Sequence, residues 1–296
     1  MIVRDLGDVL SARLDDGTPG DPGLIGPDGQ GWRVARERVV LAGGPAALLL
    51  QLAHPLVAAG VADHSDFESH PLHRLARTLT AVLTAGFGDH EQAEAVGAQV
   101  AAVHSRVTGA LATPVGPFPA GTPYRAGDPD LALWVYATLV TLALDTFDAF
   151  VAPLSEQERA TYYDQTKPVA QVFGVTDEVL PDTYADFEHY VAAAEDHVLA
   201  VGDDALAAAD GVLCADLGPA GSLARPLTRL LAAAFLPPAL RAQYGLAWRR
   251  RERVAFAVTR AVVRTTVRVL PRRWRFWPHD RTARRRVDRP ARAGAA

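Results

Sequence analysis

The chain has 296 residues, 49% of them hydrophobic, which is enough for one large domain or two small ones with a substantial core. Its single cysteine, Cys214, excludes disulfide frameworks, cysteine-based zinc sites, iron–sulfur clusters and covalently attached c-type haem within one chain. The net charge of −4 conceals an asymmetry, because the segment from Arg249 onward holds 16 arginines against three acids.

The first 31 residues read as a short amphipathic segment followed by a loop rich in glycine, proline and aspartate. The segment has acids inside it and lacks the long apolar run of a signal peptide, so we expect a cytoplasmic protein. We assign residues 1–31 to this N-terminal segment and loop, and expect the folded domain to begin at Trp32.

The next helices belong to a long uncharged run over residues 39–62. Residues 32–40 predict a helix that meets the break Gly43–Gly44–Pro45, and a second helix runs from there to about residue 61. A run this apolar is either a membrane span or a helix buried on all sides. The glycines, prolines, Gln51 and His54 favour the buried helix, and Pro55 predicts a kink at His54.

Helical periodicity continues through most of the remaining chain, and strand alternation is nearly absent. Asp89 and Asp128 are suited to cap helices, and Ser155 with Glu158 forms a capping box. The predicted helices cover residues 71–87, 90–111, 129–151, 156–173, 183–201, 222–234 and 248–269, with a weaker signal at 206–213, while 113–128 reads as a loop. We therefore predict an all-α fold, a single multi-helix domain over residues 32–270 around a buried cofactor pocket.

The arginine-rich tail, residues 271–296, completes the domain organisation. Its composition predicts fraying or disorder from residue 281 onward. A basic tail can bind nucleic acid or anionic lipid, or it can pack on the acidic body of the protein. Aromatic residues in and before the tail favour packing; they are Trp248, Phe256, Trp274, Phe276 and Trp277. We expect no specific nucleic acid partner and keep peripheral membrane contact through the tail as a hypothesis.

Three histidines fall in patterns that allow chemistry. His104 lies within an apolar helical stripe, where an imidazole is either an axial ligand of a metal or haem, or a core histidine bonded to a carbonyl. His54 has the same two readings, and His64 lies near the end of its helix, where Asp63 and Asp66 could orient it. The pattern alone leaves these alternatives open.

Arg74 and Thr78 are four residues apart and project on one side of a helix, with Arg77 close by. Such arginines either pair with propionates or carboxylates beside an apolar pocket, or serve only as surface charges. A dimetal carboxylate site has only half a motif, Asp186-x-x-His189, so we do not expect one. The chain also lacks a P-loop, a Gly-x-Ser-x-Gly elbow and a Rossmann glycine fingerprint.

Four segments together resemble a known family. They are ERVVLAGGPAALLLQLAHPLVAAGVADHSDF, PLHRLARTLTAVLTAGFGD, VHSRV and DPDLALWVYATLV, and in this order they are similar to the oxygenase MpaB / latex-clearing-protein family. The resemblance covers roughly residues 32–201. It implies a mostly helical fold that holds a non-covalent b-type haem, and an oxidative cleavage with dioxygen of an olefinic bond or a prenyl chain.

The resemblance also implies roles for individual residues. His104, in VHSRV, matches the histidine that ligates the haem iron, and we expect Val103 and Val107 beside the haem. Arg74, Arg77 and Thr78 match an arginine, a basic residue and a threonine that lie near the haem in the family.

Other residues are expected to shape the pocket or to depart from the family. His54, His64 and Arg74 are expected to line it, and His54 is the alternative axial ligand. Tyr136 stands where close relatives read WVHATL, so it replaces a histidine near the haem, and we expect it to point into the core or pocket. The glutamate proposed as a base in rubber oxygenases has no counterpart in residues 51–63.

The sequence therefore predicts a haem b-dependent oxygenase that acts with dioxygen on a hydrophobic small molecule, by oxidative cleavage of a carbon–carbon bond. The alternative hypotheses are a non-catalytic helical protein that binds an apolar ligand or lipid, and a membrane- or nucleic-acid-associated protein driven by its arginines. Neither the oligomeric state nor the redox partner follows from the sequence.

Overall fold

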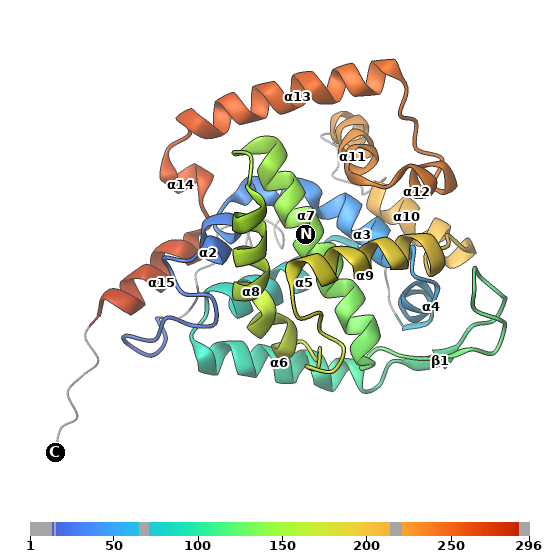
Figure 1. Cartoon of the computed structure of the whole chain (residues 1–296), viewed down its shortest axis with the longest axis horizontal. Helices are drawn as coiled ribbons and strands as arrows, with labels where there is room; N and C mark the ends of the chain where they lie inside the picture. The colour runs from blue at the N-terminus through green and yellow to red at the C-terminus, as the bar shows by residue number, and fades with distance from the viewer. Residues whose placement is uncertain (1–13, 15, 65–70, 214–220, 290–296) are drawn as a thin grey trace.

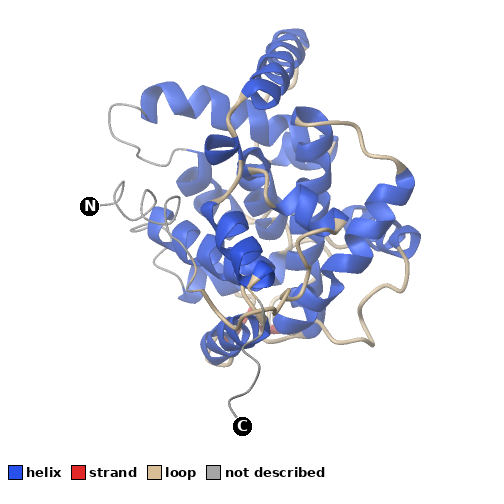
Figure 2. Ribbon diagram, turned by 90° about the vertical axis from the view of Figure 1, so that its left-hand side faces the viewer, coloured by secondary structure: helices blue, strands red, loops and turns tan. Residues whose placement is uncertain are grey.

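The computed structural model describes residues 14, 16–64, 71–213 and 221–289, leaving aside the side chains of residues 71–75 and 221–223. The described chain is almost entirely helical, as the sequence predicts, with one two-stranded hairpin (Figures 1 and 2). The elements in order are α2 (Gln30–Ala35), η1 (Arg38–Gly43), α3 (Gly44–Leu52), α4 (Pro55–His64), α5 (Pro71–Phe87), α6 (His90–His104), β1 (Thr108–Ala110), β2 (Pro123–Arg125), α7 (Pro129–Phe150), α8 (Glu156–Val172), α9 (Tyr184–His197), α10 (Asp203–Leu213), α11 (Gly221–Phe235), α12 (Pro238–Gln243), α13 (Arg250–Val269), α14 (Arg272–Arg275) and α15 (Pro278–Asp288).

Helix α7 runs through the middle of the fold, in contact with η1, α2, α3, α8 and α13 (Figure 1). Asp128 caps it as predicted, by accepting a hydrogen bond from the Asp130 backbone N–H, and Pro129 occupies its first position. Among the described helices, α7 alone is long and apolar enough to cross a membrane by itself, yet 61% of its apolar stretch is buried inside the protein. The contacts identify it as the central helix of the core.

The predicted kink at His54 is a break between two helices. Helix α3 ends at Leu52, α4 begins at Pro55, and the pair Arg38–Leu52 and Pro55–His64 is bent by 99°. Proline at the first turn of α4 has no N–H to leave unpaired, so it favours a new start there over a continuous helix. The bend is too sharp for the single kinked helix that the sequence suggested.

Helix α6 begins where predicted, with a capping box between Asp89 and Gln92, but it ends at His104, seven residues before the predicted end at Leu111. The following residues form β1, which pairs with β2 in antiparallel register, Thr108 opposite Arg125. Gly109 allows this pairing, because a Cβ there would lie 2.4 Å from the Tyr124 hydroxyl. The sequence analysis missed this hairpin.

The C-terminal arginines fold into the body. Residues 281–288, where the composition predicted fraying, are helical in α15, and His279, Asp280 and Ala283 are buried. Asp280 accepts hydrogen bonds from the Trp32 indole N–H (2.7 Å) and from Arg284 (3.0 Å). The alternative in which the tail packs on the body therefore holds for α14 and α15.

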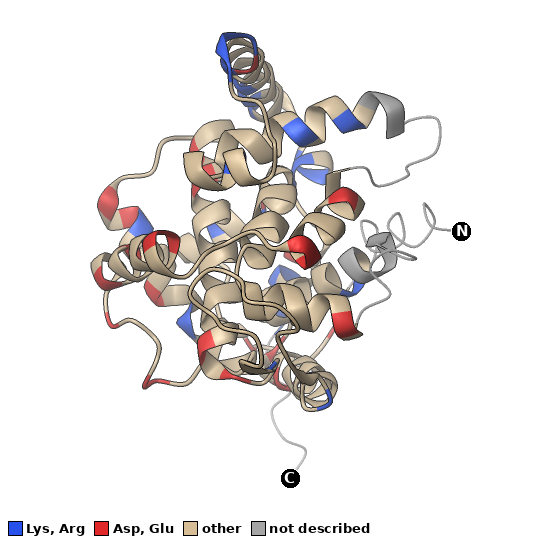
Figure 3. Ribbon diagram, turned by 90° about the vertical axis from the view of Figure 1, so that its right-hand side faces the viewer, with Lys and Arg blue, Asp and Glu red and all other residues tan. Residues whose placement is uncertain are grey.

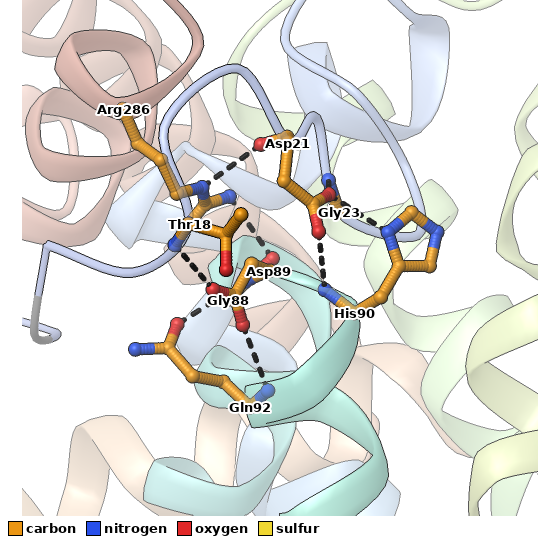
Figure 4. A network of polar contacts seen from close by, with 8 residues as sticks. All are labelled: Thr18, Asp21, Gly23, Gly88, Asp89, His90, Gln92 and Arg286. Carbon is orange, nitrogen blue, oxygen red and sulfur yellow. Dashed lines mark hydrogen bonds and ion pairs between the residues drawn. The ribbon is translucent and has the colours of Figure 1, made fainter. Parts of the chain in front are cut away.

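Arg286, which is 1% exposed, joins the tail to the N-terminal loop and to the turn between α5 and α6 (Figure 4). Its guanidinium donates to the carbonyls of Asp21 (2.9 Å) and Gly88 (3.0 Å). The Asp89 carboxylate accepts from the Thr18 backbone N–H at 2.7 Å. These bonds fix the turn at one end of the α5–α6 pair, opposite the end that carries His104.

Candidate functional site

The ends of α4 and α6 meet at the hairpin. The His64 ring Nε2 lies 3.0 Å from the Thr108 carbonyl of β1, and its ring contacts that of Tyr124 edge to face, with centroids 6.2 Å apart. Tyr124 on β2 is buried, and its hydroxyl donates to the Asp63 carboxylate at 2.5 Å. Burial, with the Asp63 charge beside it, raises the pKa of Tyr124, so this hydroxyl stays protonated.

This geometry corrects one expectation about His64. Asp63 was expected to orient it, but Asp63 accepts from Tyr124, and the Thr108 carbonyl holds His64 instead. Asp66, the other expected partner, lies outside the described residues.

His104 is the last residue of α6 and is partly buried. Its neighbour Val103 is 48% exposed, an unusual value for a valine on a helix that packs against two others. Val107, one turn further on, packs on the apolar cluster of Ala59, Leu111 and Tyr124. His104 and Val107 flank the start of β1, whose Thr108 carbonyl holds His64, so the three residues lie at one corner of the molecule, and their part in a cofactor pocket stays a prediction.

The predicted residues of α5 belong to this end of the molecule. Helices α5 and α6 pack together and are joined by only Gly88 and Asp89, so they run antiparallel and the first turns of α5 lie beside the last turns of α6. Arg77 and Thr78 are exposed there. Arg74 is in the first turns of the same helix, and its side chain lies outside the described part of the structure.

His54 lies at the break between α3 and α4 and is 8% exposed. Its ring is 5.6 Å from that of Phe118, in the loop between β1 and β2, so it lies beneath the hairpin. Its Nδ1 is buried with no hydrogen-bond partner among the described residues. Burial lowers the pKa of His54 to about 4, so this imidazole is neutral near pH 7.

Tyr136 lies between α7 and α8, where its hydroxyl is 2.9 Å from the Thr166 hydroxyl and its ring is near that of Tyr163. Burial raises its pKa, so the phenol is neutral. The expectation that Tyr136 points into the core holds. Its hydroxyl forms a hydrogen bond that joins α7 to α8. A role for Tyr136 in a cofactor pocket stays a prediction.

The sequence analysis missed Thr108, Phe118 and Tyr124, all supplied by the hairpin. Phe118 and Tyr124 lie in a segment read only as a loop, and their partners, His54 and Asp63, are more than 60 residues away. The one signal present was the alternation at Pro123–Arg125, where only the middle residue is apolar and buried.

Within the described residues, no three histidine, cysteine, aspartate or glutamate side chains come close enough to hold a metal ion by themselves. The half-motif Asp186-x-x-His189 gains no further ligands among these residues. A haem, by contrast, needs only one protein ligand to its iron and an apolar wall.

Comparison with known proteins identifies the class of this helical protein. Residues 32–265 match the family model of the ER-bound oxygenase mpaB/B'/rubber oxygenase catalytic domain, and the chain belongs to this family. It is therefore an oxygenase, which acts on a small molecule with oxygen, and the non-catalytic alternative is set aside.

Its curated relatives carry no further functional information. The chain is 27% identical over 239 residues to the uncharacterized protein Rv2237 of Mycobacterium tuberculosis and equally to the uncharacterized protein Mb2261 of Mycobacterium bovis. Each match covers 78% of this chain and 91% of the relative. No solved structure matches the chain.

Proposed function

We propose that this oxygenase binds haem b non-covalently, with His104 as the axial ligand, and oxidises a hydrophobic small molecule by cleaving a carbon–carbon bond. The observation that carries the proposal is the position of His104 at the C-terminal end of α6. Val103 beside it is half exposed, and Val107 packs on an apolar cluster. An imidazole flanked by apolar surface is suited to ligate iron while its neighbours cover one face of a porphyrin.

Steric access favours His104 over His54. A porphyrin needs a wide apolar space on one side of its ligand imidazole. His54 is 8% exposed and packed against Phe118, so a porphyrin could reach it only if the hairpin moved away. His104 is partly buried and adjoins exposed side chains, Val103 among them, so a large flat group has better access to it than to His54.

When bound, haem iron supplies the activation of dioxygen. The protein residues would do the rest. Arg77 and Thr78, both exposed on α5, would offer a cation and a hydroxyl to the carboxylates of the bound group. Val103 and Val107 would give the bound group an apolar wall, which would favour a hydrophobic substrate and exclude water. His64, held by the Thr108 carbonyl, would place an imidazole at the same corner.

The test is the ultraviolet–visible spectrum of protein expressed with a haem precursor, oxidised and then reduced with dithionite. We expect a Soret band and a pyridine haemochrome of the b type. His104→Ala should lose the haem or change its spectrum, whereas His54→Phe should keep the wild-type spectrum. His197→Gln, at an exposed histidine on α9, is the matched control.

Two results would contradict the proposal. Protein without a Soret band, even after haem is added back, would remove haem from the reaction. A His104→Ala variant that retains haem with an unchanged spectrum, while His54→Phe loses it, would move the ligand to His54.

A further inference from the structure

Helix α13 lies on the outside of the molecule (Figures 1 and 2). It exposes a line of valines to solvent. Val254, Val258 and Val262 recur every four residues and are 56%, 57% and 59% exposed. Val269, in the last turn, is 77% exposed. Residues at this spacing share one helical face, so Val254, Val258 and Val262 form an apolar stripe along the outer face of α13.

The stripe belongs to a firmly anchored helix. Phe256, on the inner face, contacts the rings of Phe150, Phe235 and Trp248. Arg264 donates to the carbonyls of Asp148 (3.3 Å) and Val151 (3.5 Å) at the end of α7. The inner face thus packs on the body, while the outer face keeps valines where solvent would favour polar residues.

Arginines accompany the stripe. Helix α13 carries six arginines and one glutamate, and its positive residues are visible on the uppermost helix in Figure 3. Arg260 and Arg268 are exposed and form no ion pair with any described residue. Trp274, just beyond the helix, is 61% exposed and directly follows the exposed arginines Arg272 and Arg273. This surface combines apolar side chains, unpaired cations and an exposed tryptophan.

The charge limits what can cover the stripe. Two copies of α13 packed face to face would bring together two helices of net charge +5, which disfavours self-association. Helix α13 has 20 residues and is about 30 Å long, and it forms a ridge on the protein surface. A ridge of this length can lie against a broad, flat partner surface. An anionic, partly apolar surface complements both its charge and its valines.

We propose that α13 is a docking surface for an anionic lipid bilayer. The valines and Trp274 would enter the boundary between headgroups and acyl chains, and the flanking arginines would bind lipid phosphates, with their alkyl stems along the apolar layer. The attachment is peripheral, because α13 lies along the surface of the protein.

This docking is separate from the proposed haem site. Figure 1 shows α13 along one edge of the molecule and α6, which carries His104, along the opposite edge. Changes on α13 should therefore leave the haem spectrum unchanged. The inference goes beyond the proposed function and can fail or hold without it.

Vesicle flotation of the full-length protein tests the proposal, with phosphatidylcholine vesicles compared with vesicles that also contain phosphatidylglycerol. We expect binding only to the anionic vesicles, and weaker binding as salt is raised. The double variant Arg260→Gln/Arg268→Gln should weaken binding about 25-fold, since each basic residue at an anionic surface contributes about fivefold. The triple variant Val254→Ser/Val258→Ser/Val262→Ser should weaken it by about tenfold or more.

Matched controls remove the same residue types elsewhere. Arg281→Gln/Arg285→Gln changes two exposed arginines of α15, and Leu206→Ser changes an apolar side chain of α10 that is 42% exposed. Both should bind as the wild type does, and every variant should keep the wild-type unfolding midpoint because the changed residues are exposed.

Three outcomes would overturn the proposal. They are absence of binding to anionic vesicles at low salt, binding that the valine and arginine variants leave unchanged, and a dimer in sedimentation that the triple valine variant converts to monomer. The last would assign the stripe to a second copy of the chain.

Discussion

Acid should destabilise this protein through two buried histidines. His54 and His279 are 8% and 4% exposed, and the Nδ1 atom of each has no hydrogen-bond partner among the described residues. His279 lies between the rings of Phe87 and Trp277. Burial lowers the pKa of both to about 4, and the charge of Arg38 lowers that of His279 further. Both imidazoles are therefore neutral in the folded protein.

The sign and size of the effect follow from linkage. The folded pKa of each histidine is about 4, below the ordinary value of 6.5, so the unfolded chain binds protons that the folded chain does not. Their contribution to stability is fully present above pH 6.5 and is lost as the pH falls toward 4. The limit is about 3 kcal/mol for each histidine, and at about pH 5 the loss is about 2 kcal/mol each.

Urea unfolding between about pH 7.5 and about pH 5 measures this loss. We expect the free energy of unfolding to fall by about 4 kcal/mol from the two histidines together. His54→Phe and His279→Phe should each remove about half of that fall, while His197→Gln, at an exposed position, should leave it unchanged. If both phenylalanine variants keep the full pH dependence, the reasoning from burial is refuted.

Three substitutions test close packing and buried bonds by thermal unfolding. Gly43→Ala should lower the free energy of unfolding by about 2 kcal/mol, because its Cβ would lie 2.4 Å from the buried Thr146 hydroxyl. Adding Thr146→Ala should restore part of that loss, and strictly additive effects of the two substitutions would contradict the clash. Glu37→Gln should lower the free energy of unfolding by about 3 kcal/mol, because the carboxylate is 1% exposed and accepts three hydrogen bonds from the Arg275 guanidinium. A loss below about 1 kcal/mol would argue against a buried ion pair. Tyr124→Phe should cost about 1 kcal/mol by removing the bond to the Asp63 side chain, and no loss would show that water replaces it.

Local signals account for most of the fold that was predictable. The caps at Asp89, Asp128 and Ser155 lie where the sequence places them, because each depends only on residues within one turn. The end of α6 does not depend on local residues in this way. Helical periodicity continues past His104, but the pairing of Gly109 with Tyr124 ends the helix, and that pairing spans a long loop.

The candidate site also has a part that the sequence could predict and a part that depends on distant contacts. The resemblance implies that His104 and the α5 residues lie near one haem; the structure shows that α5 packs on α6, and the roles of these residues stay predictions. The Asp63–Tyr124 bond and the contact of His54 with Phe118 join segments more than 60 residues apart, so no local pattern contains them. The burial of the His54 ring without a hydrogen-bond partner for Nδ1 among the described residues likewise depends on how the core packs, and no local sequence pattern shows it.

The arginine-rich C-terminus shows why composition alone misleads. Arginines in one run have two fates: Arg275 and Arg286 bond to Glu37 and to backbone carbonyls in the body, while Arg260 and Arg268 remain unpaired on the surface. Each fate depends on whether a distant acceptor lies within reach, which only the fold decides. The Glu37 carboxylate neutralises Arg275 and the body buries Arg286, whereas Arg260 and Arg268 on α13 stay exposed and form no ion pair with a described residue. The surface charge available to a membrane is thus set by the tertiary pairing of the tail and not by its net charge.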